Sequence, residues 1–151
     1  MIKLNKLNIK IVFFDIDGTL TNTNKEITKS TINTINKLIE KDIYIVLCSG
    51  RINNYINKFL KVISKSKYTI SNNGALIYDN ELNKVIMLDP LYTNDLEYIW
   101  KYSNNTKSTF IVNTIKNKYS NKYVKNKEDK IIINNLEDII DEKLQLVISN
   151  E

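Results

Sequence analysis

An α/β fold is predicted by this sequence: a Rossmann-like, doubly wound parallel sheet followed by a smaller α/β unit. Short apolar runs alternate with helical patterns through the first half of the chain, which is typical of strands joined by crossover helices. Each of the three glycines follows an apolar run, and the pattern changes after the single proline. We therefore expect a core unit over residues 1–87 and a second α/β unit over residues 88–151.

The first half alternates between expected strands and helices. Residues 9–14 form a continuous apolar run, which suits a strand buried on both faces of a sheet. Residues 28–41 and 52–63 each carry an apolar stripe at helical spacing. Residues 43–48 and 68–71 are two further apolar runs. The order β-α-β-α-β implies a parallel sheet with right-handed crossovers.

The pattern then becomes less regular. Residues 75–78 and 85–88 flank a polar turn and predict a hairpin, and Pro90 marks the expected boundary between the units. Beyond it we expect a helix from a Thr93 cap to about residue 102 and a polar connection at residues 116–129. Strands are expected at residues 109–113, 131–133 and 144–149, and a short helix at 135–140.

Composition excludes several kinds of site. Histidine is absent and Cys48 is the only cysteine, which excludes His-based zinc sites, Ser-His-Asp triads and internal disulfides. Any metal must be held by oxygen ligands, which favours Mg²⁺. No apolar stretch is long enough for a signal peptide or a membrane span, so we expect a cytoplasmic protein.

The net charge of +5 raises the alternative of a nucleic-acid-binding module. The lysines are scattered along the chain, and no interleaving of basic and aromatic residues resembles a known reader of DNA or RNA. A solvated, lysine-rich surface is therefore the favoured interpretation, and we expect no nucleic-acid partner. Arg51 is the only arginine.

The glycines mark the expected functional edge. Gly18, Gly50 and Gly74 each lie just beyond an expected parallel strand, and ligands of open α/β sheets bind at the carboxyl ends of the strands. Ordinary strand-to-helix turns would be enough to explain the three glycines. They do not explain the polar residues at the same edge, which are Asp15, Asp17, Ser49 and Asn73.

The two carboxylates carry the most information. Asp15 and Asp17 are two residues apart and point the same way if the strand geometry continues. A Mg²⁺ ion would offset their charges and those of a phosphate. One aspartate is then suited to nucleophilic attack on phosphorus and the other to proton transfer. Ser49 and the backbone near Gly50, at the start of a helix, are suited to hold phosphoryl oxygens. A surface turn or a Ca²⁺ loop is the alternative for Asp-x-Asp-Gly alone.

Three segments together resemble the haloacid dehalogenase (HAD) superfamily. Residues 14–20 (Phe-Asp-Ile-Asp-Gly-Thr-Leu) resemble its first motif. Residues 48–51 (Cys-Ser-Gly-Arg) resemble its second motif in the form found in Cof-type sugar-phosphate phosphatases. Residues 70–79 are similar to the Asn-Gly-Ala segment that precedes the cap domain in that subfamily. The resemblance implies the N-terminal part of a HAD core followed by a partial α/β cap.

The resemblance also implies roles. Asp15 would be the nucleophile and a Mg²⁺ ligand, and Asp17 the general acid and base, with its backbone carbonyl on the metal. Ser49 and Gly50 would bind the phosphoryl group, while Arg51 and Asn73 would shape the substrate pocket; for Arg51, a structural ion pair is the alternative. Thr19 would brace the loop. In the cap, Trp100, Tyr102 and Phe110 are candidates for the pocket, with core packing as their alternative.

One departure limits the resemblance. The family has a lysine motif and an acidic Gly-Asp motif nearer its C-terminus, and no glycine follows Gly74 here. The function expected is a Mg²⁺-dependent phosphomonoester hydrolase acting on small phosphorylated metabolites such as sugar phosphates, truncated and incomplete alone. The alternatives are a non-catalytic remnant, one half of a split protein whose second chain carries the missing motifs, and a phosphomutase of the same fold.

Overall fold

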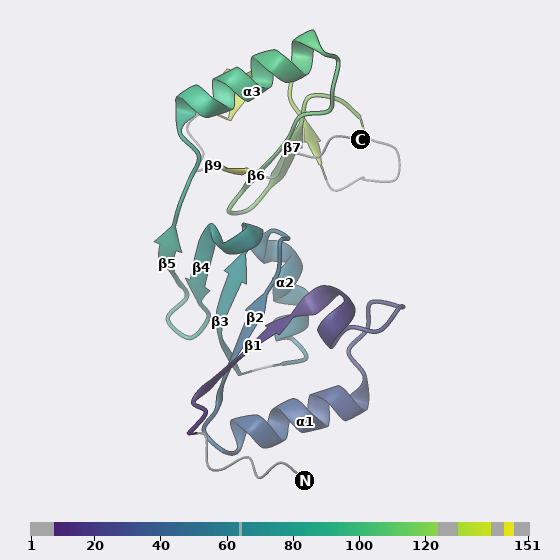
Figure 1. Ribbon diagram of the computed structural model, residues 1–151, viewed down its shortest axis with the longest axis vertical. Helices are drawn as coiled ribbons and strands as arrows, with labels where there is room; N and C mark the ends of the chain where they lie inside the picture. The colour runs from purple at the N-terminus through teal and green to yellow at the C-terminus, as the bar shows by residue number, and fades with distance from the viewer. Residues whose placement is uncertain (1–7, 64, 124–129, 140–143, 147–151) are drawn as a thin grey trace.

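The computed structural model describes residues 8–63, 65–123, 130–139 and 144–146. It contains two sheets, which lie one beyond the other along the long axis of the molecule (Figure 1). The first sheet has five strands in the order β1-β2-β3-β4-β5. Their bounds are Ile11–Asp15, Tyr44–Cys48, Ser66–Ser71, Leu76–Asp79 and Lys84–Leu88. β1, β2 and β3 are parallel, and β4 and β5 complete an antiparallel meander.

Two helices connect the parallel strands, as the sequence predicts. α1 (Lys29–Ile39) begins after Thr28, whose side-chain oxygen accepts a hydrogen bond from the Thr31 backbone nitrogen at 3.2 Å. α2 (Asn53–Leu60) follows β2. Both helices pack on one face of the sheet, where they share an apolar cluster with side chains of β2. Its buried members are Ile16, Leu20, Ile35, Ile45, Leu47, Ile56, Phe59 and Ile63.

The expectation that β1 is buried on both faces is wrong for the described residues. Val12 and Phe14 are partly buried, and Phe14 packs against the apolar cluster, but their alternate neighbours Ile11 and Phe13 are 38% and 57% exposed. Tyr44, which pairs with Ile11, is 49% exposed. β1 is also an edge strand in the described part of the sheet. No described helix covers this face, because both crossovers lie on the other one.

The second sheet carries α3 on one side (Figure 1). Its strand order is β8-β7-β6-β9, and α3 (Thr93–Asn105) precedes it. The strand bounds are Ile111–Thr114 for β6, Lys118–Ser120 for β7, Ile131–Ile132 for β8 and Leu144–Leu146 for β9. Beneath α3 lies a second cluster of Leu96, Phe110, Val112, Tyr119, Ile133, Leu136 and Ile139. Phe110 and Trp100 meet edge to face, with ring centroids 5.1 Å apart.

The predicted α/β class is confirmed, with a mixed sheet in the first unit. β7 lies where a polar connection was expected, and the cap of α3 is Tyr92 instead of Thr93. Asn135 caps a short helix at Leu136–Asp138. The predicted strand at residues 144–149 is seen as β9 over Leu144–Leu146, and the remainder lies outside the described residues. The boundary at residues 87 and 88 stays a prediction, since β5 runs through Leu88.

In the part of the chain that the structure describes, no helix has both the length and the apolar character needed to cross a membrane.

Candidate active site

Three loops meet at the carboxyl edge of the parallel strands. Asp15 ends β1 and pairs with Cys48, the last residue of β2, which in turn pairs with Ile70 of β3. The chain leaves β1 in an irregular turn over Ile16–Leu20, closed by a 3.1 Å hydrogen bond from the Thr21 nitrogen to the Ile16 carbonyl. The order in the sheet therefore brings the three glycine-bearing segments together, as the sequence predicts.

Asp15 and Asp17 have different surroundings. The Asp15 side chain is exposed and accepts a long hydrogen bond of 3.4 Å from the Thr19 hydroxyl. Asp17 lies beyond the strand, within the turn whose middle residue, Gly18, has a φ of +85°. That conformation costs a glycine little and a residue with a side chain considerably more.

Arg51 holds the carboxylate of Asp17 with two nitrogens. Its Nε donates to Oδ2 at 2.8 Å and its Nη2 donates to Oδ1 at 3.2 Å. The guanidinium also lies 4.1 Å from the centroid of the Tyr55 ring on α2. Arg51 therefore forms the ion pair that was the alternative to a pocket role, and its partner is the second of the two predicted catalytic aspartates. The ion pair with Asp17 and the stacking on Tyr55 together orient the guanidinium at the edge of the site.

The loop after β2 is held by its own backbone. Ser49 is buried, its nitrogen donates to the Ile70 carbonyl at 2.9 Å, and its hydroxyl accepts from the Arg51 nitrogen at 3.2 Å. Gly50 faces the side chain of Asn73, because a Cβ atom built at Gly50 would lie 2.5 Å from Asn73 Oδ1. The structure thus brings Ser49, Gly50 and Asn73 together.

The loop after β3 contains three consecutive residues with positive φ. Asn72, Asn73 and Gly74 have φ values of 50°, 55° and 100°, and asparagine is among the few non-glycine residues that adopt this region readily. The nitrogen of Asn72 donates to the Arg51 carbonyl at 3.0 Å, which joins this loop to the loop after β2. Asn72 was not among the predicted site residues, although an asparagine pair before a glycine is a recognisable turn signal.

Two asparagines join the two units beside this edge. Asn113 of β6 donates from Nδ2 to Asn72 Oδ1 at 3.2 Å, and Asn54 of α2 donates from Nδ2 to the Lys116 carbonyl at 2.7 Å. Asn113 is 3% exposed. No local signal in the sequence marks Asn113 as a site residue, because its contact joins residues 41 positions apart.

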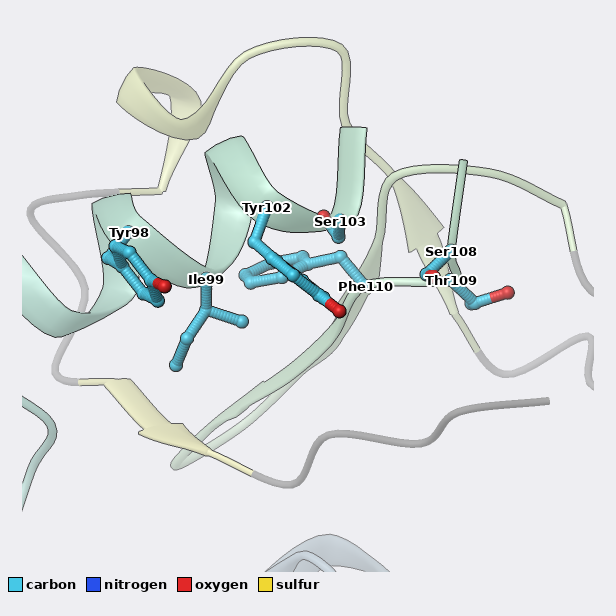
Figure 2. Close-up of a pocket in the computed structure, with 7 residues that line it drawn as sticks. All are labelled: Tyr98, Ile99, Tyr102, Ser103, Ser108, Thr109 and Phe110. Atoms are coloured by element: carbon cyan, nitrogen blue, oxygen red, sulfur yellow. The ribbon is translucent and has the colours of Figure 1, made fainter. Parts of the chain in front are cut away.

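The three aromatic candidates in the second unit lie on the α3 side of the small sheet. Phe110 is fully buried and Trp100 packs against the same cluster, so the core-packing alternative holds for both. Tyr102 is 56% exposed and lines a groove of about 140 Å³ together with Tyr98, Ile99 and Phe110 (Figure 2). This groove lies between α3 and the start of β6, on the opposite face from Asn113.

The pKa of the Cys48 thiol is affected by its burial and by the charge of Asp15. Burial raises the pKa of its thiol, and the negative charge of Asp15 on the neighbouring strand raises that pKa further. The thiol is therefore protonated at neutral pH and poorly suited to act as a nucleophile.

The described part of the site contains few carboxylates that could bind a metal ion. Among the described residues, no group of three or more histidine, cysteine, aspartate or glutamate side chains gathers as a metal-binding cluster would. At the carboxyl edge of the parallel strands, Asp15 and Asp17 are the carboxylates. Each carboxylate oxygen of Asp17 accepts one hydrogen bond from Arg51, whereas the Asp15 carboxylate accepts one long hydrogen bond from Thr19.

The fold and this edge define an α/β protein with an acidic pair after its first strand and a small second unit next to the site. Residues 12–150 match the sequence model of the haloacid dehalogenase-like hydrolase family. The chain belongs to this family.

Two curated relatives carry phosphatase names. The chain is 24% identical to 5-amino-6-(5-phospho-D-ribitylamino)uracil phosphatase YcsE of Bacillus subtilis, over 82% of this chain and 49% of the relative. It is 31% identical to YxeH of the same organism, also named as a phosphatase, over 62% of this chain and 36% of the relative.

Solved structures agree on the fold. A haloacid dehalogenase-like hydrolase from Bacteroides thetaiotaomicron aligns with a TM-score of 0.76 at 20% identity, over 86% of this chain and 53% of that one. The HAD subclass IIB sugar phosphatase BT4131 aligns with a TM-score of 0.63 at 25% identity, over 74% and 43%. The chain therefore spans about half the length of the relatives that it matches.

Proposed function

We propose that this chain carries the nucleophile half of a Mg²⁺-dependent phosphomonoester hydrolase that works through an aspartyl-phosphate at Asp15. The observation that carries the proposal is the position of Asp15. It ends a parallel strand with an exposed carboxylate, beside the loop of Ser49 and Gly50 and next to an aspartate that Arg51 orients. Neighbouring loops at one edge of the sheet would then supply the nucleophile, the groups that bind the phosphate and the residue that transfers the proton.

The proposed reaction has two displacements. A carboxylate oxygen of Asp15 forms a bond to phosphorus, and the bond between phosphorus and the ester oxygen breaks. The ester oxygen keeps the electron pair and takes a proton from Asp17. Asp17 then removes a proton from a water molecule, whose oxygen attacks phosphorus and releases phosphate from Asp15. The Ser49 hydroxyl and the backbone nitrogens near Gly50 would hold the phosphoryl oxygens, while Asn73 and Arg51 would bound the pocket.

Asp17 needs a free oxygen for this role. In the structure both of its oxygens accept hydrogen bonds from Arg51. The two side chains are 37% and 42% exposed, and ion pairs of that kind contribute only about 0–1 kcal/mol. One of the two hydrogen bonds can therefore open at small cost when a substrate arrives, while the other keeps Asp17 oriented.

The donor set suits Mg²⁺. This ion prefers oxygen ligands, retains several water molecules and is usually bound through one or two carboxylates and the phosphate of the substrate. The Asp15 carboxylate and the Asp17 carbonyl would hold it. When bound, it would neutralise charge on the phosphate and on Asp15.

The proposed substrates are small phosphorylated metabolites, with sugar phosphates as the leading class. Two comparisons support this choice: one aligned structure is a sugar phosphatase, and one relative is named for a phosphorylated ribityl compound. The proposed site of action is the cytoplasm.

The test is turnover of p-nitrophenyl phosphate by the purified chain with and without Mg²⁺. Asp15→Asn should abolish Mg²⁺-dependent turnover. Asp42→Asn is a matched control, because Asp42 is exposed and has a φ of 56°, which asparagine tolerates. Release of inorganic phosphate, as opposed to transfer within the substrate, separates a hydrolase from a phosphomutase. Equal turnover by Asp15→Asn would refute the assignment of the nucleophile.

A second candidate is favoured by the open side of β1. Ile11, Phe13 and Tyr44 expose apolar surface next to an edge strand, which is a surface that proteins normally cover. We infer that a second chain supplies a strand beside β1 together with the missing lysine and acidic motifs.

The polypeptide encoded next to this chain in its genome is the first partner to test. Co-expression with that polypeptide should produce Mg²⁺-dependent turnover. A dye that fluoresces when it binds exposed apolar surface should be less fluorescent with the complex than with the chain alone. Full turnover by the chain alone, or no complex with that polypeptide, would count against a split enzyme.

A further inference from the structure

The small sheet presents a polar face toward the active-site edge. Along β6, Val112 packs into the cluster beneath α3, so its neighbour Asn113 lies on the opposite face. The contact with Asn72 shows that this face looks toward the core. Asn72 donates to the Arg51 carbonyl, and Arg51 holds Asp17. Asn113 is thus two hydrogen-bonded contacts away from the residue that orients the proposed acid.

Asn113 has one occupied polar atom and one that lacks a partner. Its Nδ2 donates to Asn72, but its Oδ1 is buried with no hydrogen-bond partner. Leaving a buried acceptor unsatisfied costs about 1–3 kcal/mol, and most such groups in native proteins are satisfied. A carbonyl oxygen can be satisfied only by a donor, so the missing partner carries an O–H or N–H group.

The neighbourhood favours a hydroxyl over an ammonium group. Lys118 of β7 stands directly opposite Asn113 in the register of the two strands, so both belong to the same face of the sheet. A positive charge at that position disfavours a cationic ligand and favours an anionic one. A phosphate ester of a hydroxylated compound combines the anion with the donor.

We propose that Asn113 Oδ1 accepts a hydrogen bond from a hydroxyl of the leaving group, which makes the site selective for phosphates of polyols over phosphates of apolar alcohols. This inference rests on the proposed function and names the part of the substrate that the second unit recognises. It also replaces the aromatic candidates Trp100, Tyr102 and Phe110, which lie on the other face of the small sheet.

The test uses two phosphonates that cannot be hydrolysed and that differ only in their hydroxyls. Hexylphosphonate and the sugar-alcohol analogue pentahydroxyhexylphosphonate are titrated into the full ¹⁵N-labelled chain with Mg²⁺. Both should shift the backbone signals of Ser49 and Gly50, and the polyol alone should shift the Asn113 side-chain amide. The chain should bind the polyol about tenfold more tightly, and Asn113→Ala should remove that preference. Asn105→Ala, at the exposed end of α3, is the control.

Asn113→Asp separates recognition from a structural role. It keeps an acceptor oxygen, so it should keep the preference for the polyol while its added negative charge weakens both ligands. Equal affinities in the original chain, or a preference that survives Asn113→Ala, would overturn the inference and leave the phosphate site standing. If neither phosphonate shifts Ser49 or Gly50, the proposed function fails and the inference with it.

Discussion

Arg51 and Asp17 are joined by a two-pronged ion pair, with Nε 2.8 Å from Oδ2 and Nη2 3.2 Å from Oδ1. The pair connects the loop after β2 to the turn after β1. Only a guanidinium offers two parallel donors of this kind, and Arg51 is the only arginine in the chain. All other basic residues of the chain are lysines, and the single arginine lies where two parallel donors contact one carboxylate.

Arg51→Lys should reduce catalysis much more than stability. Lysine keeps the charge but loses the fork, so Asp17 is no longer held at two points, and we expect turnover to fall about tenfold or more. The exposed ion pair should account for less than about 1 kcal/mol of unfolding free energy. Lys58→Ala is the control: Lys58 also lies over the Tyr55 ring, at 3.6 Å, without hydrogen bonding to Asp17. Unchanged turnover in Arg51→Lys would show that the fork is not needed.

Gly50→Ala should act through Asn73. The new Cβ atom would meet Asn73 Oδ1 at 2.5 Å, and the end of that side chain can rotate away. We therefore expect a small loss of stability, a displaced Asn73 side chain and weaker binding of inorganic phosphate.

A double-mutant cycle checks this coupling. In an Asn73→Ala background the obstacle is gone, so Gly50→Ala should add almost nothing to the phosphate affinity already lost. Additive effects of the two substitutions would mean that Gly50 is required for its backbone alone.

Sequence reasoning located the elements whose signals are local. α1 was predictable because Thr28 caps it and its apolar positions recur at helical spacing. β7 was not, because residues 118–120 contain only one buried apolar side chain, Tyr119, and the strand exists through its pairing with β6. Tertiary pairing decided that segment, and its composition did not.

The same distinction applies to the site. Asp15 and Ser49 could be placed at one edge because each follows an apolar run, and parallel strands align their carboxyl ends. The contact between Asn72 and Asn113 joins two units and had no signal in either segment. In a chain with many asparagines, the identity of one asparagine carries little information without its position in space.

Phe13 and Phe14 provide a test of the open face of β1. They are neighbours in one strand, but Phe13 is 57% exposed and Phe14 packs against the core cluster. Phe13→Ser should leave the unfolding temperature nearly unchanged and reduce self-association, measured by light scattering. Phe14→Ser should cost about 3 kcal/mol or more. If Phe13→Ser destabilises the protein as much as Phe14→Ser does, the open face is covered in solution.

Cys48 should react slowly with iodoacetamide. Burial and the charge of Asp15 both raise the pKa of the thiol, so the thiolate fraction at pH 8 lies below that of a free cysteine. The rate should rise with pH with a midpoint above that of glutathione, measured in EDTA. Asp15→Asn removes the smaller of the two causes and should shift the midpoint partly downward. A midpoint at or below that of glutathione would contradict the burial of this thiol.

Phe110→Ala should destabilise the second unit selectively. Phe110 is fully buried beneath α3 and meets Trp100 edge to face, while the first unit has a separate apolar cluster. Truncation of a buried phenylalanine costs about 3–5 kcal/mol, which is a large fraction of what a small cluster can supply. Trp100 is the only tryptophan, so its fluorescence should report early unfolding of this unit during a urea titration, ahead of the far-ultraviolet circular dichroism of the whole chain.

Tyr102→Ala, which removes an exposed ring from the same groove, should leave both transitions within about 0.5 kcal/mol of the original. A single, coincident transition in Phe110→Ala would show that the two units unfold together and that the contacts of Asn113 and Asn54 couple them strongly.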